Sequence, residues 1–159
     1  MLTKISTKMQ SKILIYPFDK GFDLSGCVLA GGCFDLLHYG HLIFLKSAAK
    51  LGPLVVALES DIAIHNGKGA NPIHTQAQRA EILSELYCVN RVILLPVLND
   101  YKDYLALVQS IQPKILAITE GDSQTDNKRM QAEEVKAEVL VVNKLIYGLS
   151  SSLIKAKHL

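Results

Sequence analysis

This sequence of 159 residues lacks the segments that would direct a protein to a membrane, to nucleic acid or out of the cell. No apolar run is long enough to span a bilayer. The polar residues 1–12 are not followed by the apolar stretch of a secretory signal. The net charge of +2 is too small to indicate a surface that binds nucleic acid or a membrane. We therefore expect a cytoplasmic protein that binds neither.

Cysteine is scarce, and its three positions (Cys27, Cys33 and Cys88) fit no metal-ligand spacing. Three cysteines cannot all pair, which agrees with a reducing compartment. Internal repeats, low-complexity segments and linkers are also missing. A hydrophobic content of 49% excludes a disordered chain. The length suits one domain, which we place at residues 27–159, preceded by an N-terminal extension at 1–26 in which residues 13–16 are a candidate edge strand.

Short apolar runs alternate with amphipathic segments along the chain. The apolar runs predict strands at 27–30, 54–58, 91–95, 114–118 and 138–142. The amphipathic segments predict helices at 41–51, 75–86, 100–111, 124–136 and 150–157, with Thr75 and Gln78 at capping-box spacing in the second. Continuous apolar strands that alternate with helices are typical of a parallel sheet covered on both faces. The sequence therefore predicts an α/β fold, a Rossmann-like open parallel sheet of about five strands.

The segment between the first predicted strand and the first predicted helix reads Gly-Gly-Cys-Phe-Asp-Leu-Leu-His-Tyr-Gly-His over residues 31–41. A strand–glycine–helix unit aims unpaired backbone N–H groups and the positive end of the helix dipole at one point. His38 and His41 lie about one helical turn apart, so both imidazoles can donate hydrogen bonds to phosphate oxygens there. Glycines at 32 and 40 allow a ligand to approach the backbone closely. This pattern predicts a site for the phosphates of a nucleotide.

Other nucleotide-binding motifs are missing. Neither G-x-G-x-x-G nor G-x-x-x-x-G-K-[ST] occurs, so the sequence supports neither a dinucleotide-binding fingerprint nor a P-loop. Cys33, His38 and His41 could also be drawn as metal ligands. No fourth ligand is in view, so we expect no metal site made by the protein alone.

Residues 32–41 resemble the G-x-F-D-x-x-H-x-G-H signature of the cytidylyltransferase-like nucleotidyltransferases, and the likeness extends over about 27–157. The resemblance implies transfer of a nucleoside monophosphate from ATP or CTP to a phosphorylated small-molecule acceptor, with release of pyrophosphate. It also implies Mg²⁺, which binds mainly through phosphates and water. Relatives are commonly dimers, so a homodimer is implied too.

The resemblance assigns roles to individual residues. It makes His38, His41 and Lys46 catalytic, although a lysine on a helix surface is often simply solvated. It places nucleotide or phosphate binding at Gly32, Cys33, Phe34, Asp35, Gly40, Lys68, Gly121, Asp122, Ser150, Ser151 and Ser152. Lys68 is expected in a loop over 66–69 that closes over phosphates. Ser151 and Ser152 occupy the threonine positions of a G-x-S-T-T element, and capping alone would explain one of the three serines.

Two weaker candidates for substrate binding are Arg79 and Glu120. Arg79 matches a family Q-R-x-x-x-L element, and it either reaches the site or pairs with Glu81 or Glu85 nearby. Glu120 lies in a loop where heptose enzymes show K-G-G-D-Y. Residues 119–123 here read Thr-Glu-Gly-Asp-Ser, so Gly121 and Asp122 match and the other three depart.

The branch that the sequence resembles most is heptose-1-phosphate adenylyltransferase, which makes lipopolysaccharide precursors. Asn71-Pro72 and the serine element at 148–152 favour it. A cytidylyltransferase that acts on glycerol 3-phosphate or a phospho-alcohol is the alternative, although the arginines usual before the serine element and near the end of the preceding helix are missing. A nucleotide-binding relative without turnover is the alternative of another class. Since no sugar-kinase segment is present, we expect a stand-alone transferase domain.

Overall fold

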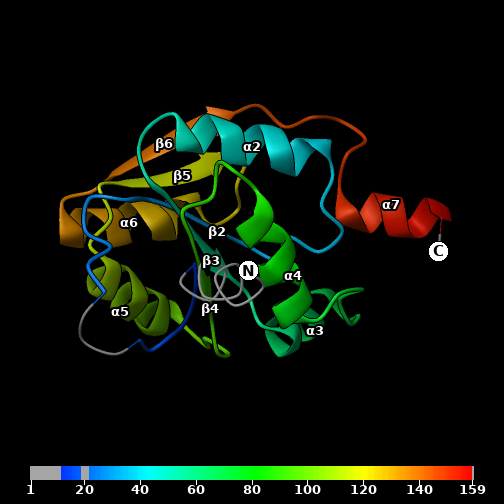
Figure 1. Ribbon diagram of the computed structural model, residues 1–159, viewed down its shortest axis with the longest axis horizontal. Coiled ribbons are helices and arrows are strands. Elements are labelled where there is room, and N and C mark those ends of the chain that lie inside the picture. The colour runs from blue at the N-terminus through cyan, green and yellow to red at the C-terminus, as the bar shows by residue number, and fades with distance from the viewer. Residues whose placement is uncertain (1–11, 19–21, 159) are drawn as a thin grey trace, which may run out of the picture.

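The computed structural model describes residues 12–18 and 22–158 (Figure 1). Its core is one sheet of six parallel strands in the order β1-β4-β3-β2-β5-β6. The strands are β1 (Ile13–Ile15), β2 (Val28–Gly32), β3 (Leu54–Leu58), β4 (Arg91–Leu94), β5 (Ile115–Thr119) and β6 (Glu138–Asn143). The α/β parallel sheet is confirmed, but it has six strands rather than about five, because the candidate edge strand forms as β1 beside β4.

Helices cover both faces of this sheet (Figure 1). They are α2 (Tyr39–Ala49), α3 (Asp61–Lys68), α4 (Gln76–Glu85), α5 (Tyr101–Ile111), α6 (Thr125–Val135) and α7 (Ser151–His158). Thr75 and Gln78 exchange the two hydrogen bonds of a capping box at the start of α4, as predicted. None of the described helices is long and apolar enough to cross a membrane.

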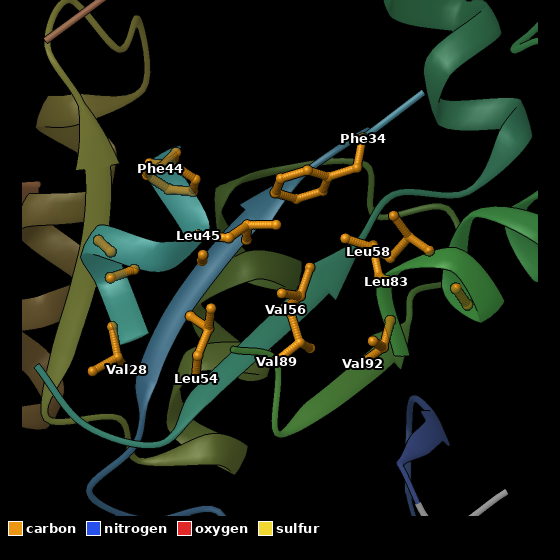
Figure 2. Packing of buried hydrophobic residues seen from close by; sticks show 14 of the residues in the cluster. Val28, Phe34, Phe44, Leu45, Leu54, Val56, Leu58, Leu83, Val89 and Val92 are labelled. Atoms are coloured by element: carbon orange, nitrogen blue, oxygen red, sulfur yellow. The ribbon is translucent and has the colours of Figure 1, made fainter. Parts of the chain in front are cut away.

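Alternate residues of the strands build two cores. Leu54, Val56 and Leu58 of β3 face α2 and α4, where they pack with Leu45 and Leu83 (Figure 2). The intervening residues of β3 face α5 and α6 and join a second cluster that includes Leu107, Val108, Ile111 and Ala132. All five residues of β3 are buried. A strand covered on both faces must be apolar throughout, which is why these strands appear in the sequence as continuous apolar runs.

The chain order reverses at β2. From β2 the chain runs to β3 and β4 on one side, and then crosses back to place β5 on the other side of β2. Ligands of open α/β sheets bind in the crevice beyond the carboxyl ends of the strands at such a reversal. The loop that carries the two histidines follows β2 directly, so the fold puts it at this crevice.

One helix of the structure is not predicted from the sequence. Residues 61–68 form α3, whereas the sequence predicts a loop over 66–69. Ser60 caps the helix by accepting a hydrogen bond from the Ala63 N–H at 3.1 Å, and Gly69 ends it in the left-handed conformation with φ 70°. The expectation of a loop around Lys68 was therefore wrong. The two glycines that suggested a loop lie within the last turn of α3 and at its C-cap.

Candidate active site

The segment between β2 and α2 adopts an unusual backbone conformation. Phe34 (φ 47°) and Leu36 (φ 53°) both lie in the left-handed region, which costs a residue with a side chain about 1–2 kcal/mol. The Phe34 ring fills the space beside Gly32, where an added Cβ would lie 2.9 Å from Cε2 of that ring. Such conformations persist where their surroundings hold them, and they are frequent at functional sites.

His38 and His41 stand together at the start of α2. Their rings stack with centroids 3.8 Å apart, and the Phe34 ring lies 5.3 Å from the His41 ring. An added Cβ on Gly40 would lie 3.0 Å from Cε1 and Nδ1 of His38, so the glycine leaves room for that imidazole. The structure therefore brings the two histidines together on one face of the helix, as their spacing predicts.

Burial favours the uncharged form of both imidazoles. Burial lowers the pKa of His41 from 6.5 to about 4, and the positive charge of Lys68 acts in the same direction. Burial also lowers the pKa of His38. The backbone N–H of His38 donates to Nδ1 of His41 at 3.3 Å. The neutral His41 ring therefore carries its proton on Nε2. His41 is thereby prepared as a hydrogen-bond donor through Nε2.

Asp35 organises the loop from inside. Its carboxylate is 2% exposed and accepts hydrogen bonds of 3.0–3.1 Å from the backbone N–H groups of Ile73 and His74. Lys155 of α7 lies 2.5 Å from the same carboxylate. Burial alone would raise the pKa of Asp35, but the hydrogen bonds from Lys155, Ile73 and His74 lower it below its usual value. The carboxylate is fully occupied by protein groups, so it positions the loop rather than facing a ligand.

The three serines at the start of α7 have different surroundings. The Ser150 hydroxyl caps the helix by accepting from the Leu153 N–H at 3.1 Å. The Ser151 hydroxyl is buried and donates to the Asp35 carbonyl oxygen. Ser152 is exposed. All three line the smaller cavity described below, with Ser151 also joining α7 to the histidine loop.

Arg79 is the most thoroughly buried charged side chain in the described part of the protein, at 1% exposure. Its guanidinium donates four hydrogen bonds of 2.5–3.1 Å, to the carbonyl oxygens of Cys33, Glu59 and His74 and to the Asp61 carboxylate. It therefore ties the histidine loop to the start of α3, and it pairs with neither glutamate of its own helix. It lines neither cavity described below.

The two predicted lysines differ in position. Lys68, the last residue of α3, is exposed and lines both cavities. Lys46 is exposed near the C-terminal end of α2 and lines neither cavity. Five residues on an α-helix rotate a side chain well away from the starting residue, so Lys46 and His41 do not share a face.

In the loop after β5, one carboxylate lines the cavities and the other does not. Asp122 lines both cavities and forms an ion pair with Lys128 of α6 at 2.6 Å. Glu120 is exposed outside the cavities, and its N–H donates to the Asn143 carbonyl oxygen at 3.1 Å. Gly121 (φ 77°) makes the turn between Glu120 and Asp122. Glu120, a candidate for substrate binding from the sequence, thus lies outside the walls of both cavities.

Two adjoining cavities open at the carboxyl ends of β2 and β5. The smaller, about 300 Å³, is lined by His38, His41, Asn143 and the serine element. The larger, about 710 Å³, is lined by residues that include Glu59, Tyr101 and Tyr104. They share the walls formed by Gly31, Gly32, Cys33, Lys68, Ala117, Asp122 and Lys128. The histidine cavity and the larger cavity therefore meet at a boundary that carries two lysines.

Three of these lining residues were not singled out from the sequence. Lys128 lies in a helix that the sequence marks only as polar surface, and Tyr104 lies in the amphipathic helix α5. Asn143 ends β6. Their side chains reach the cavities because parallel strands bring segments far apart in the chain to one edge of the sheet. No local sequence signal distinguishes them.

The residues present fit a magnesium ion that is carried mainly by phosphates. Among the described residues, no three His, Cys, Asp or Glu side chains converge on one point. Among the described residues, Asp122 is the one carboxylate in the walls of the smaller cavity, and Asp35 is already occupied by protein donors. Mg²⁺ commonly takes one or two carboxylates, with phosphate and water oxygens completing its shell.

The chain is similar in sequence to several known proteins. The Bifunctional protein HldE of Helicobacter hepaticus is 36% identical over 150 residues, which are 93% of this chain and 30% of that protein. The FAD synthase of Thermococcus onnurineus is 37% identical over 134 residues, which are 83% of this chain and 79% of that protein. This chain spans less than a third of the HldE relative.

A solved structure is also similar. The lipopolysaccharide core biosynthesis protein from Thermoplasma volcanium superposes with a TM-score of 0.60 at 28% identity, covering 76% of this chain and 96% of that one. The family model described as cytidylyltransferase-like matches residues 29–157, a span that starts in β2 and includes the histidine loop, both cavities and nearly all of α7. On that match, the chain belongs to the cytidylyltransferase-like family.

Proposed function

We propose that the protein is a nucleotidyltransferase, which transfers a nucleoside monophosphate to a phosphorylated small molecule and releases pyrophosphate. The observation that carries this proposal is the stacked pair His38 and His41, which lines a cavity that adjoins a second, larger one. Such an arrangement suits a reaction between two ligands. The nucleotide would lie in the histidine cavity and the acceptor in the larger one.

The chemistry needs no deprotonating base. An oxygen of the acceptor phosphate, already an anion, forms a bond to the α-phosphorus of the nucleoside triphosphate. The bond from that phosphorus to the bridging oxygen breaks, and pyrophosphate leaves with the electron pair. The protein must supply alignment and positive charge where negative charge grows. His41 Nε2–H, His38, Lys68, Lys128 and the N-terminus of α2 supply them at this site.

Magnesium belongs to the proposal as a companion of the triphosphate. Asp122 is the side chain that would hold it, with phosphate and water oxygens. When bound, the ion would neutralise phosphate charge. Lys128 would then be free of its ion pair with Asp122 and could face a phosphate instead.

We propose that the nucleotide is ATP and the acceptor a sugar phosphate of the heptose 1-phosphate type. The HldE relatives and the lipopolysaccharide core biosynthesis protein support this choice. A flavin phosphate is a second candidate, because the FAD synthase relative aligns over 79% of its own length. CTP with glycerol 3-phosphate is a third, which the resemblance of the sequence implies.

Pyrophosphate release tests these alternatives. The purified protein with Mg²⁺ is assayed with ATP or CTP against heptose 1-phosphate, glycerol 3-phosphate and flavin mononucleotide. We expect the highest kcat/KM with ATP and heptose 1-phosphate. Faster turnover with CTP and glycerol 3-phosphate would reverse the ranking of substrates. Nucleotide binding without release from any pair would refute the enzyme proposal and support the relative without turnover. We also propose a homodimer, which light scattering would detect as twice the mass of the chain.

A further inference from the structure

Glu59 and Tyr104 form a polar pair in the wall of the larger cavity. Glu59 follows β3 directly, and Tyr104 projects from α5 toward it. The Tyr104 hydroxyl donates to Oε1 of Glu59 at 2.9 Å. A sheet edge and a helix thus fix the carboxylate from two sides. Neither residue belongs to the histidine motif or to the serine element.

The second carboxylate oxygen has no partner. Glu59 Oε2 is buried from solvent and accepts no hydrogen bond from the residues that the structure describes. In the described part of the chain, the other buried side-chain atom in this condition is His38 Nδ1, which belongs to the smaller cavity. A buried polar atom without a partner costs about 1–3 kcal/mol. Each cavity therefore has one such atom in a residue of its wall.

Tyr104 offers a second acceptor beside the first. Burial raises the pKa of Tyr104, and the Glu59 charge raises it further, so the phenol keeps its proton. That proton is engaged with Oε1 of Glu59, which leaves the lone pairs of the Tyr104 oxygen free. Glu59 Oε2 and Tyr104 Oη together form a patch that accepts hydrogen bonds and repels anions.

The charged side chains of the larger cavity favour one orientation of a phosphate ester bound there. The two lysines of the larger cavity, Lys68 and Lys128, lie in the walls shared with the histidine cavity. The Glu59 carboxylate lines the larger cavity but not the histidine cavity. A phosphate ester would place its phosphate near the lysines and its uncharged end near Glu59. Burial raises the pKa of Glu59, and the positive charges of Arg79 and Lys128 act against this effect.

We propose that Glu59 and Tyr104 form an acceptor subsite that binds hydroxyl groups, so that the protein selects a polyhydroxylated phosphate ester over one without hydroxyls. The inference rests on the proposed function, because it assigns the larger cavity to the acceptor. The hydroxyls of the ligand donate to Glu59 Oε2 and to Tyr104. A sugar phosphate supplies them from its ring, and flavin mononucleotide supplies them from its ribityl chain.

The test measures binding, so it does not depend on turnover. Calorimetry is run with an ATP analogue that has a methylene bridge between the α- and β-phosphorus. Three ligands are compared: heptose 1-phosphate, flavin mononucleotide and cyclohexyl phosphate, which has a six-membered ring without hydroxyls. The variant Glu59→Gln replaces Oε2 or Oε1 by an amide that donates instead of accepting. Tyr104→Phe removes the hydroxyl alone, and Glu81→Gln removes an exposed carboxylate outside both cavities.

We expect Glu59→Gln to weaken binding of the hydroxyl-bearing ligand by about tenfold or more and to leave cyclohexyl phosphate unchanged. Tyr104→Phe should weaken it less, and Glu81→Gln should have no effect. The ligand whose binding responds, heptose 1-phosphate or flavin mononucleotide, identifies the source of the hydroxyls. Equal weakening of all three ligands, or no weakening of any, would overturn the subsite. Wild-type protein that binds neither hydroxyl-bearing ligand would overturn it as well.

Failure of the proposed function would look different. Wild-type protein that binds heptose 1-phosphate with the expected response to Glu59→Gln, but releases no pyrophosphate, would keep the subsite and refute the transferase. Pyrophosphate release with unchanged binding in Glu59→Gln would keep the transferase and refute the subsite. The two readouts therefore separate the two proposals.

Discussion

The stacked imidazoles of His38 and His41 are shifted toward their neutral forms before any ligand arrives. Stacking at 3.8 Å would be unfavourable for two cations, and burial lowers the pKa of both rings. A triphosphate beside them would reverse this balance, because nearby negative charge favours the protonated ring. The pair can therefore gain positive charge as the substrate binds and the transition state forms.

Removal of one imidazole tests that role. The variant His41→Ala loses the Nε2–H donor and should lower kcat by at least about a hundredfold, as deletion of a donor to developing charge commonly does. The measurement is steady-state pyrophosphate release. Tyr39→Ala, which changes an exposed neighbour outside both cavities, is the matched control. Activity near that of the control would disprove the assignment.

Gly40 tests the position of His38 without touching its chemistry. In Gly40→Ala, the added Cβ would lie 3.0 Å from Cε1 and Nδ1 of His38, so the ring must move by a few tenths of an ångström or more. Since alanine favours a helix more than glycine does, the melting temperature should not fall. We expect kcat to drop at least tenfold, because small misplacements at the reacting centre are costly. Unchanged kcat would show that the site tolerates displacement of this ring.

Substitution of Arg79 should affect the stability of the protein rather than its kcat. A lysine in its place keeps the charge but has one nitrogen to replace the three that make four hydrogen bonds. Arg79→Lys should lower the free energy of unfolding by about 2–4 kcal/mol, as loss of buried charged hydrogen bonds does. Urea unfolding measures it, with Arg129→Lys on the exposed side of α6 as the control. Equal stability of the two variants would show that the hydrogen bonds of Arg79 do not stabilise the fold.

At the scale of elements, α7 is the piece whose attachment matters most to the site. It extends at one end of the molecule beyond the sheet (Figure 1). Two of its residues contact the histidine loop: Ser151 donates to the Asp35 and Leu36 carbonyl oxygens, and Lys155 pairs with the Asp35 carboxylate. Ser150 and Ser152 line the smaller cavity only while α7 is docked. Asp35 therefore connects the histidine loop with the serine element.

Loss of the Lys155 contact should release this helix. In Lys155→Gln, the Asp35 carboxylate keeps its two backbone donors but loses its counter-charge. We expect faster amide hydrogen exchange in Ser151–His158 and unchanged exchange in α2 and α4. Lys157→Gln, which alters an exposed lysine of the same helix, should exchange like the wild type. Protection of α7 that is equal in both variants would show that Ser151 alone secures it.

At the scale of the whole molecule, stability should depend on acid in a defined window. The folded protein binds a proton at His41 more weakly than the unfolded chain does, with a pKa of about 4 against 6.5. The unfolded state therefore gains protons first as the pH falls, and the free energy of unfolding decreases between about 6.5 and 4. Asp35, whose pKa is lowered, contributes stability above 3.8 that is lost as the pH falls further.

Thermal melting across this range measures the effect. We expect the melting temperature to fall from pH 7 toward pH 4, and His41→Ala to reduce the slope between 6.5 and 4 because it removes the buried imidazole. His65→Ala, an exposed histidine on α3, is the control and should keep the wild-type slope. Identical slopes for His41→Ala and the wild type would show that this imidazole is not the group that titrates.

The sequence predicted most of the architecture because the relevant signals are local. Apolar runs such as residues 54–58 become strands buried on both faces, and the Thr75–Gln78 capping box forms as its spacing requires. The missed helix α3 has only Ile64 buried among its eight residues, so its apolar pattern was too weak to outweigh two glycines. Similarly, β1 has only three residues. It is recognisable as a strand because it pairs with β4, a pairing that its own short sequence does not predict.

By itself, the sequence determined the parallel α/β sheet, the loop with two histidines at the start of a helix, and the family that this loop resembles. All three follow from short-range order in the chain. Only the tertiary structure decided which polar groups reach the cavities. It placed Lys68, Asp122 and Lys128 between the cavities, engaged Arg79 and Asp35 within the protein, and left Lys46 and Glu120 outside. The reason is physical: side-chain direction at a sheet edge depends on the packing of distant helices, which no local pattern encodes.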